Sequence, residues 1–242
     1  MRILSILSLI LSACATAAPP PGDAVLAIGD SVMAWNGDHG IPEAVESTLG
    51  RPVVDRSQSL ARLTNASGLA GVLGFDITRQ FRGGDWDWVI LTGGGNDLRD
   101  TCLTPAEDDV LSGLIDAELT GDVPRLIGHI RTTGAKVAFV GYYDGVEGQP
   151  GAFAPCQGAF DTINARMTRL AAERPGVLFF DAGEVIDPRD AGLYDGDFVH
   201  PSPRGAALIG RELARRMLTF EEGGRSETSR PSASVARRGA TG

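Results

Sequence analysis

The chain has 242 residues, of which 43% are hydrophobic and 22% charged, a balance typical of a soluble globular protein. Its 31 acidic and 22 basic residues give a net charge of −9, which argues against a nucleic-acid-binding protein because that class needs a basic face. Residues 1–22 and 221–242 do not look like part of the folded domain. About 200 residues remain between them, enough for one domain with a substantial core.

The first 22 residues are typical of an export signal followed by a short linker. Arg2 precedes an apolar stretch at residues 3–11 that is too short to span a membrane but suits a leader. The sequence LSAC, which ends at Cys14, resembles the lipobox of bacterial lipoproteins, in which the cysteine is acylated. We therefore expect an exported protein of the bacterial cell envelope that contacts the membrane only through a lipid on Cys14. A plain leader cleaved near residues 15–17 is the alternative, and it predicts a periplasmic or secreted protein.

Five apolar runs without polar alternation predict β-strands that are covered on both faces, as in a parallel sheet. The five runs are residues 25–28, 52–55, 88–92, 136–140 and 177–181, and helical segments separate them. The alternation predicts one α/β domain over residues 23–220, with three layers (α/β/α) and a flavodoxin-like five-stranded parallel sheet of order 2-1-3-4-5. Residues 221–242 are rich in Gly, Ser and Arg without apolar periodicity, and we expect a disordered tail there.

Two further cysteines, Cys102 and Cys156, make an even pair in a chain that we expect to be exported, where disulfides persist. Each lies a few residues beyond the end of a predicted strand, so a bridge between them is geometrically feasible. Such a bridge would stabilise the fold by about 4 kcal/mol in the chain-entropy account. Two buried free thiols are the alternative.

Three short polar motifs carry the candidate chemistry. They are GDS at residues 29–31, GGND at residues 94–97 and DFVH at residues 197–200. The first two follow the first and third predicted strands, which are neighbours at the point where the strand order reverses, so we expect them to meet in one crevice. The Ser31 hydroxyl can act as a nucleophile if a base takes its proton, and His200 is the candidate base because histidine exchanges protons near neutral pH. Asp197 can orient that imidazole.

Over roughly residues 24–218, these motifs and their order resemble the SGNH (GDSL-type) hydrolase family of esterases and lipases. The resemblance implies a serine hydrolase that cleaves carboxylic esters through an acyl-enzyme intermediate. It assigns the nucleophile to Ser31, the base to His200 and the orienting carboxylate to Asp197. It also implies three oxyanion donors: the backbone N–H of Ser31, a backbone N–H from the loop after the second strand, and the side-chain amide of Asn96.

The loop after the second strand departs from the family pattern. The family has a glycine there, whereas residues 57–63 contain none, and our alignment places Leu60 at that position. A leucine N–H can still donate to an oxyanion, but a left-handed backbone at this residue would cost about 1 kcal/mol or more. We also expect its bulky side chain to crowd the site.

Several residues beside the motifs are expected to support the site. Asp30 and Asp97 are predicted to accept hydrogen bonds from backbone amides, and Gly94 to let the chain pass close to substrate. Trp35 is a candidate for substrate contact, and the loop at residues 144–155 is expected to wall the crevice. The sequence holds no cluster of metal ligands, no phosphate-binding glycine motif and no dinucleotide fingerprint, so we expect neither a metal nor a cofactor.

The expected partner is therefore a small-molecule, lipid or carbohydrate ester. Acyl transfer or deacetylation on envelope carbohydrate and lysophospholipid cleavage are alternatives, because they use the same three side chains. A different class stays open as well, namely a non-catalytic envelope lipoprotein that binds a ligand in the crevice. The replacement of the expected glycine by Leu60 is the feature that favours this last alternative.

Overall fold

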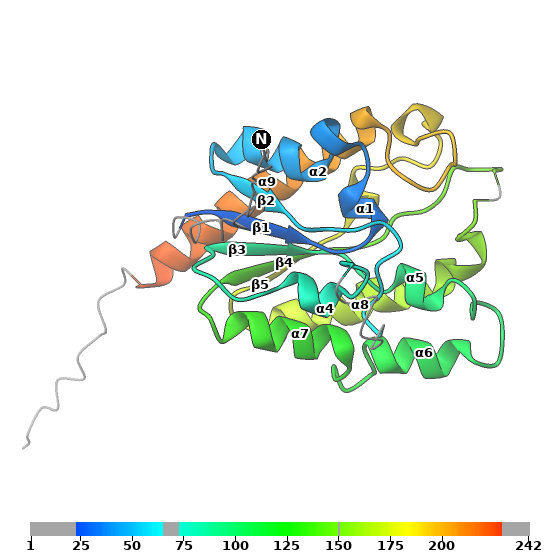
Figure 1. Ribbon diagram of the computed structural model, residues 1–242, viewed down its shortest axis with the longest axis horizontal. Coiled ribbons are helices and arrows are strands. Elements are labelled where there is room, and N and C mark those ends of the chain that lie inside the picture. The colour runs from blue at the N-terminus through cyan, green and yellow to red at the C-terminus, as the bar shows by residue number, and fades with distance from the viewer. Residues whose placement is uncertain (1–22, 65–72, 150, 229–242) are drawn as a thin grey trace, which may run out of the picture.

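The computed structural model of the protein describes residues 23–64, 73–149 and 151–228 (Figure 1). Five parallel strands form one sheet in the order β2-β1-β3-β4-β5, which confirms the predicted order and fold class. The strands are β1 (Val25–Ile28), β2 (Val53–Asp55), β3 (Trp88–Leu91), β4 (Lys136–Val140) and β5 (Val177–Phe180). All residues of β1 and β3 are buried, which explains why these runs lack polar alternation.

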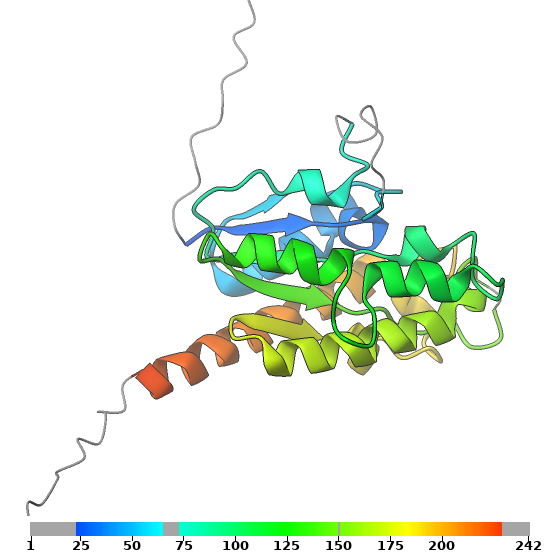
Figure 2. The ribbon, with the colours of Figure 1, turned by 90° about the horizontal axis from the view of Figure 1, so that it is seen from below.

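Helices cover both faces of the sheet. The helices that pack along it are α2 (Ile41–Leu49), α4 (Ile77–Gln80), α7 (Asp122–Arg131), α8 (Gln157–Glu173) and α9 (Pro203–Thr228). The helices and turns at the strand ends are α1 (Ser31–Ala34), η1 (Gly37–His39), α5 (Gly95–Leu98), α6 (Glu107–Leu114), η2 (Ala154–Cys156), η3 (Ala182–Glu184) and η4 (Ala191–Leu193). Helices α2 and α9 pack together on one face, and α7 and α8 lie along the other (Figures 1 and 2). No helix in the described ranges is long and apolar enough to cross a membrane.

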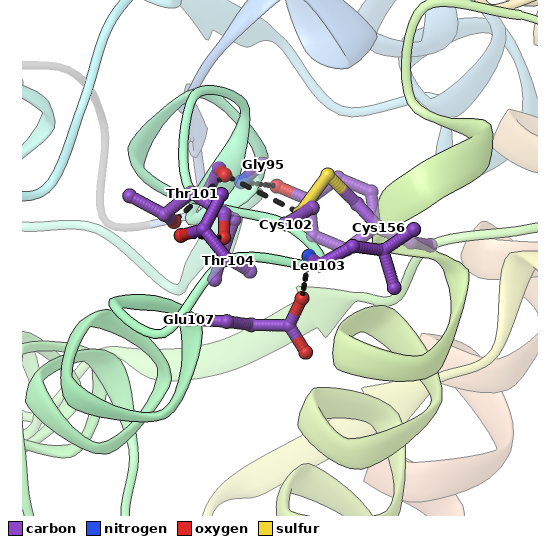
Figure 3. The surroundings of a disulfide bond; sticks show 9 residues. Gly95, Thr101, Cys102, Leu103, Thr104, Glu107 and Cys156 are labelled. Atoms are coloured by element: carbon purple, nitrogen blue, oxygen red, sulfur yellow. Dashed lines mark hydrogen bonds between the residues drawn. A yellow bond between two sulfur atoms is a disulfide. The ribbon is translucent and has the colours of Figure 1, made fainter.

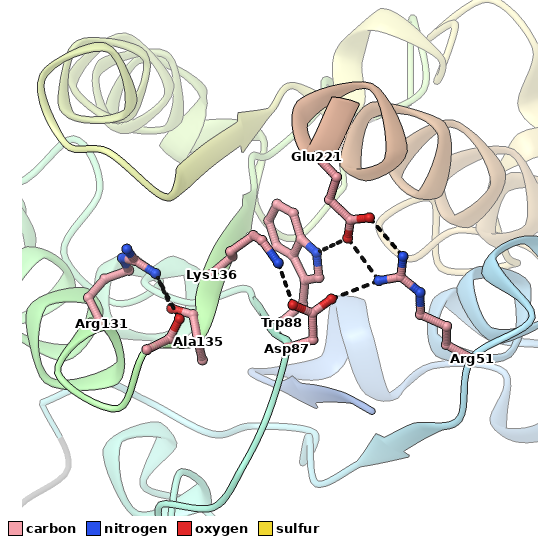
Figure 4. A network of polar contacts seen from close by, with 8 residues as sticks. Arg51, Asp87, Trp88, Arg131, Ala135, Lys136 and Glu221 are labelled. Atoms are coloured by element: carbon pink, nitrogen blue, oxygen red, sulfur yellow. Dashed lines mark hydrogen bonds and ion pairs between the residues drawn. The ribbon is translucent and has the colours of Figure 1, made fainter. Parts of the chain in front are cut away.

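Helix α9 continues beyond residue 220, so the predicted boundary of a disordered tail at residue 221 is too early. Glu221 explains the extension, because its carboxylate accepts two hydrogen bonds from the Arg51 guanidinium, at 2.8 and 2.7 Å, and one from Nε1 of Trp88 at 2.7 Å (Figure 4). Asp87 pairs with Arg51 at 2.8 Å and also with Lys136. The network anchors α9 to the sheet at the ends of β3 and β4 away from the three motifs. The predicted signal segment with Cys14, and residues 229–242, lie outside the described residues.

We expect acidification to weaken this junction. Hydrogen bonding by Arg51 lowers the pKa of Glu221 from 4.5 to about 2. A carboxylate whose pKa is lower in the folded than in the unfolded chain adds stability above the unfolded value and loses it as the pH falls towards the folded value. Glu221→Gln should therefore lower the free energy of unfolding by about 1–2 kcal/mol at pH 7, as measured by urea denaturation. This deficit should shrink between pH 5 and pH 3.

The exposed neighbour Glu222 provides the matched control. Glu222→Gln should change the free energy of unfolding by less than about 0.5 kcal/mol at either pH. Equal losses for the two variants, or a loss at Glu221 that does not depend on pH, would contradict the assignment.

Candidate active site

The nucleophile and the base that the motifs predict lie within hydrogen-bond distance of each other. Ser31 begins α1 just beyond β1, and His200 lies on the loop before α9. Oγ of Ser31 lies 2.7 Å from Nε2 of His200, although 169 positions separate the two residues. On the other side of the ring, Nδ1 of His200 lies 2.5 Å from Oδ2 of Asp197. His200 is thus placed to take the proton of the serine hydroxyl, with Asp197 placed to balance the imidazolium that results.

Asp197 and His200 are held by the fold of their own loop. The N–H of Asp195 donates to the carbonyl of His200 at 2.8 Å and closes the loop at its base. Oδ1 of Asp197 accepts the backbone N–H groups of Val199 and His200 at 2.9 and 3.0 Å. Partial burial raises the pKa of Asp197, but hydrogen bonds from His200 outweigh it, so the pKa lies below its usual value. Asp197 is therefore ionised at neutral pH, as a carboxylate that balances a protonated imidazole must be.

Asp30 is buried, with 2% of its surface exposed, and it fixes the segment that carries the nucleophile. Its Oδ1 accepts the N–H of Val32 at 3.1 Å, as the N-cap of α1, and the hydroxyl of Thr92 at 3.2 Å. Its Oδ2 accepts the Tyr142 hydroxyl at 3.0 Å, and the oxygen of that hydroxyl accepts the N–H of Gly95 at 2.6 Å. Burial raises the pKa of Asp30, against the lowering effect of these hydrogen bonds. Through Tyr142, Asp30 joins the start of α1 to the start of α5.

Asp97 and Asn96, both on α5, hold the loop that follows β2. Asp97 accepts the N–H of Leu63 at 3.1 Å, together with the N–H and the hydroxyl of Thr64 at 2.9 and 2.6 Å. Nδ2 of Asn96 donates to the carbonyl of Ala61 at 3.1 Å. An asparagine amide has two N–H donors, and the second one of Asn96 donates to no other residue in the described ranges. The loop is therefore fixed against α5, and Asn96 keeps one donor for a ligand.

Two backbone N–H groups complete the set of candidate oxyanion donors. The N–H groups of Ser31 and Leu60 donate no hydrogen bond to any residue that the structure describes. Leu60 directly precedes Ala61, whose carbonyl Asn96 binds, so Leu60 lies beside α5. Leu60 has the left-handed backbone that the alignment anticipates, with φ of 69°. Leu60 is 59% exposed and does not line the pocket described next, so the expectation that its side chain crowds the site is wrong.

A pocket of about 350 Å³ opens beside the three motifs. Ser31, Asn96 and His200 lie in its wall, and the segment after β4 supplies much of the rest, as expected for residues 144–155. Its apolar and aromatic lining comprises Val32, Tyr142, Tyr143, Val146, Phe153, Ala154, Phe160, Pro188, Phe198 and Val199. A mostly apolar cavity with a few convergent polar groups is the usual form of a small-molecule site. The described residues contain no group of three or more His, Cys, Asp or Glu side chains that could hold a metal ion.

Two expected neighbours of the substrate lie elsewhere. Gly94 does not line the pocket, and a Cβ on it would meet the side chain of Leu114 at 3.3 Å, so the close approach at Gly94 is to the core. Gly95 lines the pocket instead. Trp35 is also absent from the lining, and its indole packs against the ring of His200.

A disulfide joins Cys102 to Cys156, with 5.0 Å between their Cα atoms, so the alternative of two free thiols is wrong (Figure 3). Cys102 lies between α5 and α6, and Cys156 ends η2, directly after pocket-lining residue Ala154 and its neighbour Pro155. The disulfide therefore ties the pocket wall to the segment that carries Asn96.

The arrangement matches a known family. A model of the GDSL-like lipase/acylhydrolase family matches residues 27–208. The chain belongs to that family. The matched range contains the GDS, GGND and DFVH motifs, the second half of β1 and the other four strands. No curated protein matches the sequence.

Solved structures share the fold of this GDSL-like chain. A proposed SGNH hydrolase from Slackia heliotrinireducens is 21% identical, with a TM-score of 0.58, and the match covers 81% of this chain and 98% of that one. A carbohydrate acetylesterase family member from Sinorhizobium meliloti is 18% identical, with a TM-score of 0.55 and coverage of 82% and 98%. A proposed arylesterase from Agrobacterium tumefaciens is 21% identical, with a TM-score of 0.54 and coverage of 82% and 99%.

Sequence reasoning missed two side chains that organise this GDSL-like site. Tyr142 bridges Asp30 and Gly95, as described above. Gln80 binds the first motif through both ends of its side-chain amide. Its Oε1 accepts the N–H of Gly29 at 2.6 Å, and its Nε2 donates to the carbonyl of Gly29 at 3.0 Å. The position of Tyr142 just beyond β4 was the one available signal, because parallel strands end at a common edge. Gln80 carried no such signal.

The backbone of Leu60 leads to a prediction. Leu60→Gly should raise the free energy of unfolding by about 0.5–1 kcal/mol, because relief of the left-handed strain exceeds the added entropy of the unfolded chain. The backbone N–H is retained, so kcat should stay within about threefold of the wild-type value. Chemical denaturation and ester hydrolysis measure the two quantities. Leu60→Ala keeps a Cβ and is the control, and a stabilisation as large as that of the glycine variant would refute the strain argument.

Proposed function

We propose that this protein is a serine esterase that hydrolyses carboxylic esters through an acyl-enzyme intermediate. The observation that carries the proposal is the continuous contact from Ser31 through His200 to Asp197 at the wall of an apolar pocket. Membership of a family of lipases and acylhydrolases supports the same chemistry.

Acylation would begin with attack of Ser31 Oγ on the ester carbonyl carbon while Nε2 of His200 takes the hydroxyl proton. The negative charge that develops on the carbonyl oxygen would be held by the N–H groups of Ser31 and Leu60 and by the Asn96 amide. When the tetrahedral intermediate collapses, the bond to the alcohol oxygen breaks and His200 returns its proton to that oxygen. The alcohol leaves and the acyl group stays on Ser31.

Deacylation would repeat these steps with water. His200 takes a proton from the water that attacks the acyl carbon, then gives that proton to Ser31 Oγ as the carboxylic acid departs. Asp197 holds the imidazole in the required tautomer through both halves. A sugar hydroxyl in place of water would make the same steps an acyl transfer.

Labelling with a fluorophosphonate probe tests this proposal directly. The purified wild-type protein should form one adduct, and peptide mapping should place it on Ser31. His200→Ala should slow the labelling by about 10³-fold or more, because the base is removed. Ser57→Ala, which alters a serine bonded to Asp55, should label at the wild-type rate. Folded wild-type protein that does not label would favour the non-catalytic alternative.

Kinetic assays on the same purified protein would define its substrate range. Burst kinetics on p-nitrophenyl esters of increasing acyl length would show the acyl-enzyme and its chain preference. Addition of an oligosaccharide acceptor separates the outcomes, because transfer yields acylated sugar whereas hydrolysis yields the free acid alone.

We also propose that the enzyme is exported and anchored through a lipid on Cys14. The LSAC sequence supports this proposal, and so does the disulfide, because such bonds persist in oxidising compartments. Radiolabelled palmitate fed to expressing bacteria should label the wild-type protein but not Cys14→Ser. Equal absence of label in both would leave the plain leader as the correct description.

A further inference from the structure

We propose that Trp35 and Asp195 form a positioning pair that fixes the ring of His200 in its reactive orientation. The inference rests on the proposed function, because it concerns the proton that His200 takes from Ser31. Neither residue lines the pocket or belongs to the three motifs.

The first observation is a face-to-face stack. The indole of Trp35 lies over the imidazole of His200 with 3.9 Å between ring centroids and 9° between the ring planes. The contacts of His200 with Ser31 and Asp197 position its two nitrogen atoms, but a modest tilt of the ring about the line between those atoms lengthens neither contact. A flat surface against one face removes that remaining freedom. The stack therefore supplies the constraint that the two hydrogen bonds lack.

The second observation is that the indole is itself fixed to the loop of His200. Nε1 of Trp35 donates to Oδ2 of Asp195 at 2.7 Å. The backbone N–H of Asp195 donates in turn to the carbonyl of His200. The neighbouring Asn36 adds a tie, because its Nδ2 donates to the carbonyl of Pro201 at 2.8 Å. Trp35 and Asn36, which follow Ser31 in the chain, are thus bonded to the loop of His200 both before and after that residue.

Trp35 is close to Ser31 in the chain, which links the support of the base to the nucleophile. Trp35 is the C-cap of α1, the short helix that Ser31 begins. The nucleophile and the surface that supports the base therefore come from one continuous segment. A shift of α1 moves both together, so the distance between Ser31 and His200 is protected against small motions of either loop.

The test is a set of variants assayed on one p-nitrophenyl ester. Trp35→Leu should lower kcat by about 10- to 100-fold with KM within about threefold, because the base is misplaced while the pocket is intact. A purely structural role for Trp35 would instead lower the unfolding temperature and change KM together with kcat, so the separation of kcat from KM is the decisive readout.

A double-mutant cycle distinguishes the contribution of the Trp35 ring from that of its hydrogen bond to Asp195. Trp35→Phe keeps an aromatic face and loses the N–H, and it should lower kcat by about three- to tenfold. Asp195→Ala removes the same hydrogen bond and also the acceptor of the Gly196 N–H, so it should cost at least as much. The double variant should lose no more than Asp195→Ala alone, because the hydrogen bond that Trp35→Phe removes is already absent there. Independent, multiplying losses would overturn the pairing of Trp35 with Asp195.

Trp86 provides the matched control, since it is buried and its Nε1 donates to the carbonyl of Gly83 at 2.9 Å. Trp86→Phe should leave kcat and KM unchanged, and thermal unfolding confirms that each variant folds. Wild-type kinetics for Trp35→Leu, in protein whose Ser31 labels normally, would overturn this inference alone. Failure of the wild-type protein to label would instead overturn the proposed function.

Discussion

Replacing Ser31 by alanine is expected to lower kcat for a p-nitrophenyl ester by about 10⁴-fold or more. The variant keeps the pocket, the oxyanion donors and the pair formed by His200 and Asp197, but it removes the oxygen that attacks the ester. No hydroxyl replaces it, because the nearby Tyr142 hydroxyl is held between Asp30 and Gly95. Steady-state kinetics on purified protein measures the loss.

Ser57→Ala tests whether the effect is specific to the candidate nucleophile. Its hydroxyl donates to Asp55 at 2.6 Å in the loop after β2, so kcat should stay within about twofold of the wild-type value. A Ser31→Ala protein that retains more than about 1% of the wild-type kcat would remove the basis for an acyl-enzyme on Ser31.

Replacing Asn96 by alanine is expected to lower kcat by about 10²- to 10³-fold with a smaller change in KM. The side-chain amide has one N–H that no described residue accepts, which suits it to an oxyanion that exists only in the transition state. The loss in kcat and kcat/KM together is the signature of an interaction made at that stage.

The control must account for the second contact of Asn96, which holds the carbonyl of Ala61. Thr64→Ala loosens the same loop by removing the hydroxyl bond to Asp97, yet it leaves the Asn96 amide in place. It should cost less than about fivefold in kcat. Equal losses for the two variants would show that Asn96 acts by holding the loop and not as an oxyanion donor.

The sheet and four central side chains of the site could be predicted because their signals are local and the topology then brings them together. Unbroken apolar runs indicate buried parallel strands, and the ends of the first and third strands are adjacent in this order. Ser31 and Asn96 each follow such a strand, so their meeting requires only the strand order. His200 and Asp197 are close in sequence and needed no long-range argument to be paired.

The contacts that hold the site could not be predicted in this way. Gln80 binds Gly29 across 51 positions, and Trp35 binds Asp195 across 160 positions. A glutamine or a tryptophan gives no indication in the sequence of which distant group it will meet. The extension of α9 was missed for the same reason. In the sequence Glu221 is one more charged residue in a polar segment, and only the structure shows that it binds Arg51 and Trp88.

The closed loop between Asp195 and His200 also bears on the rigidity of the site. The N–H of Asp195 donates to the carbonyl of His200 and the side chain of Asp197 contacts the imidazole, so the carboxylate and the imidazole keep their mutual placement within one closed loop. Trp35 and Asn36 bind this loop on both sides of His200. A displacement of the imidazole from Ser31 therefore requires that these two outer bonds break first, while the contact between Asp197 and His200 can survive.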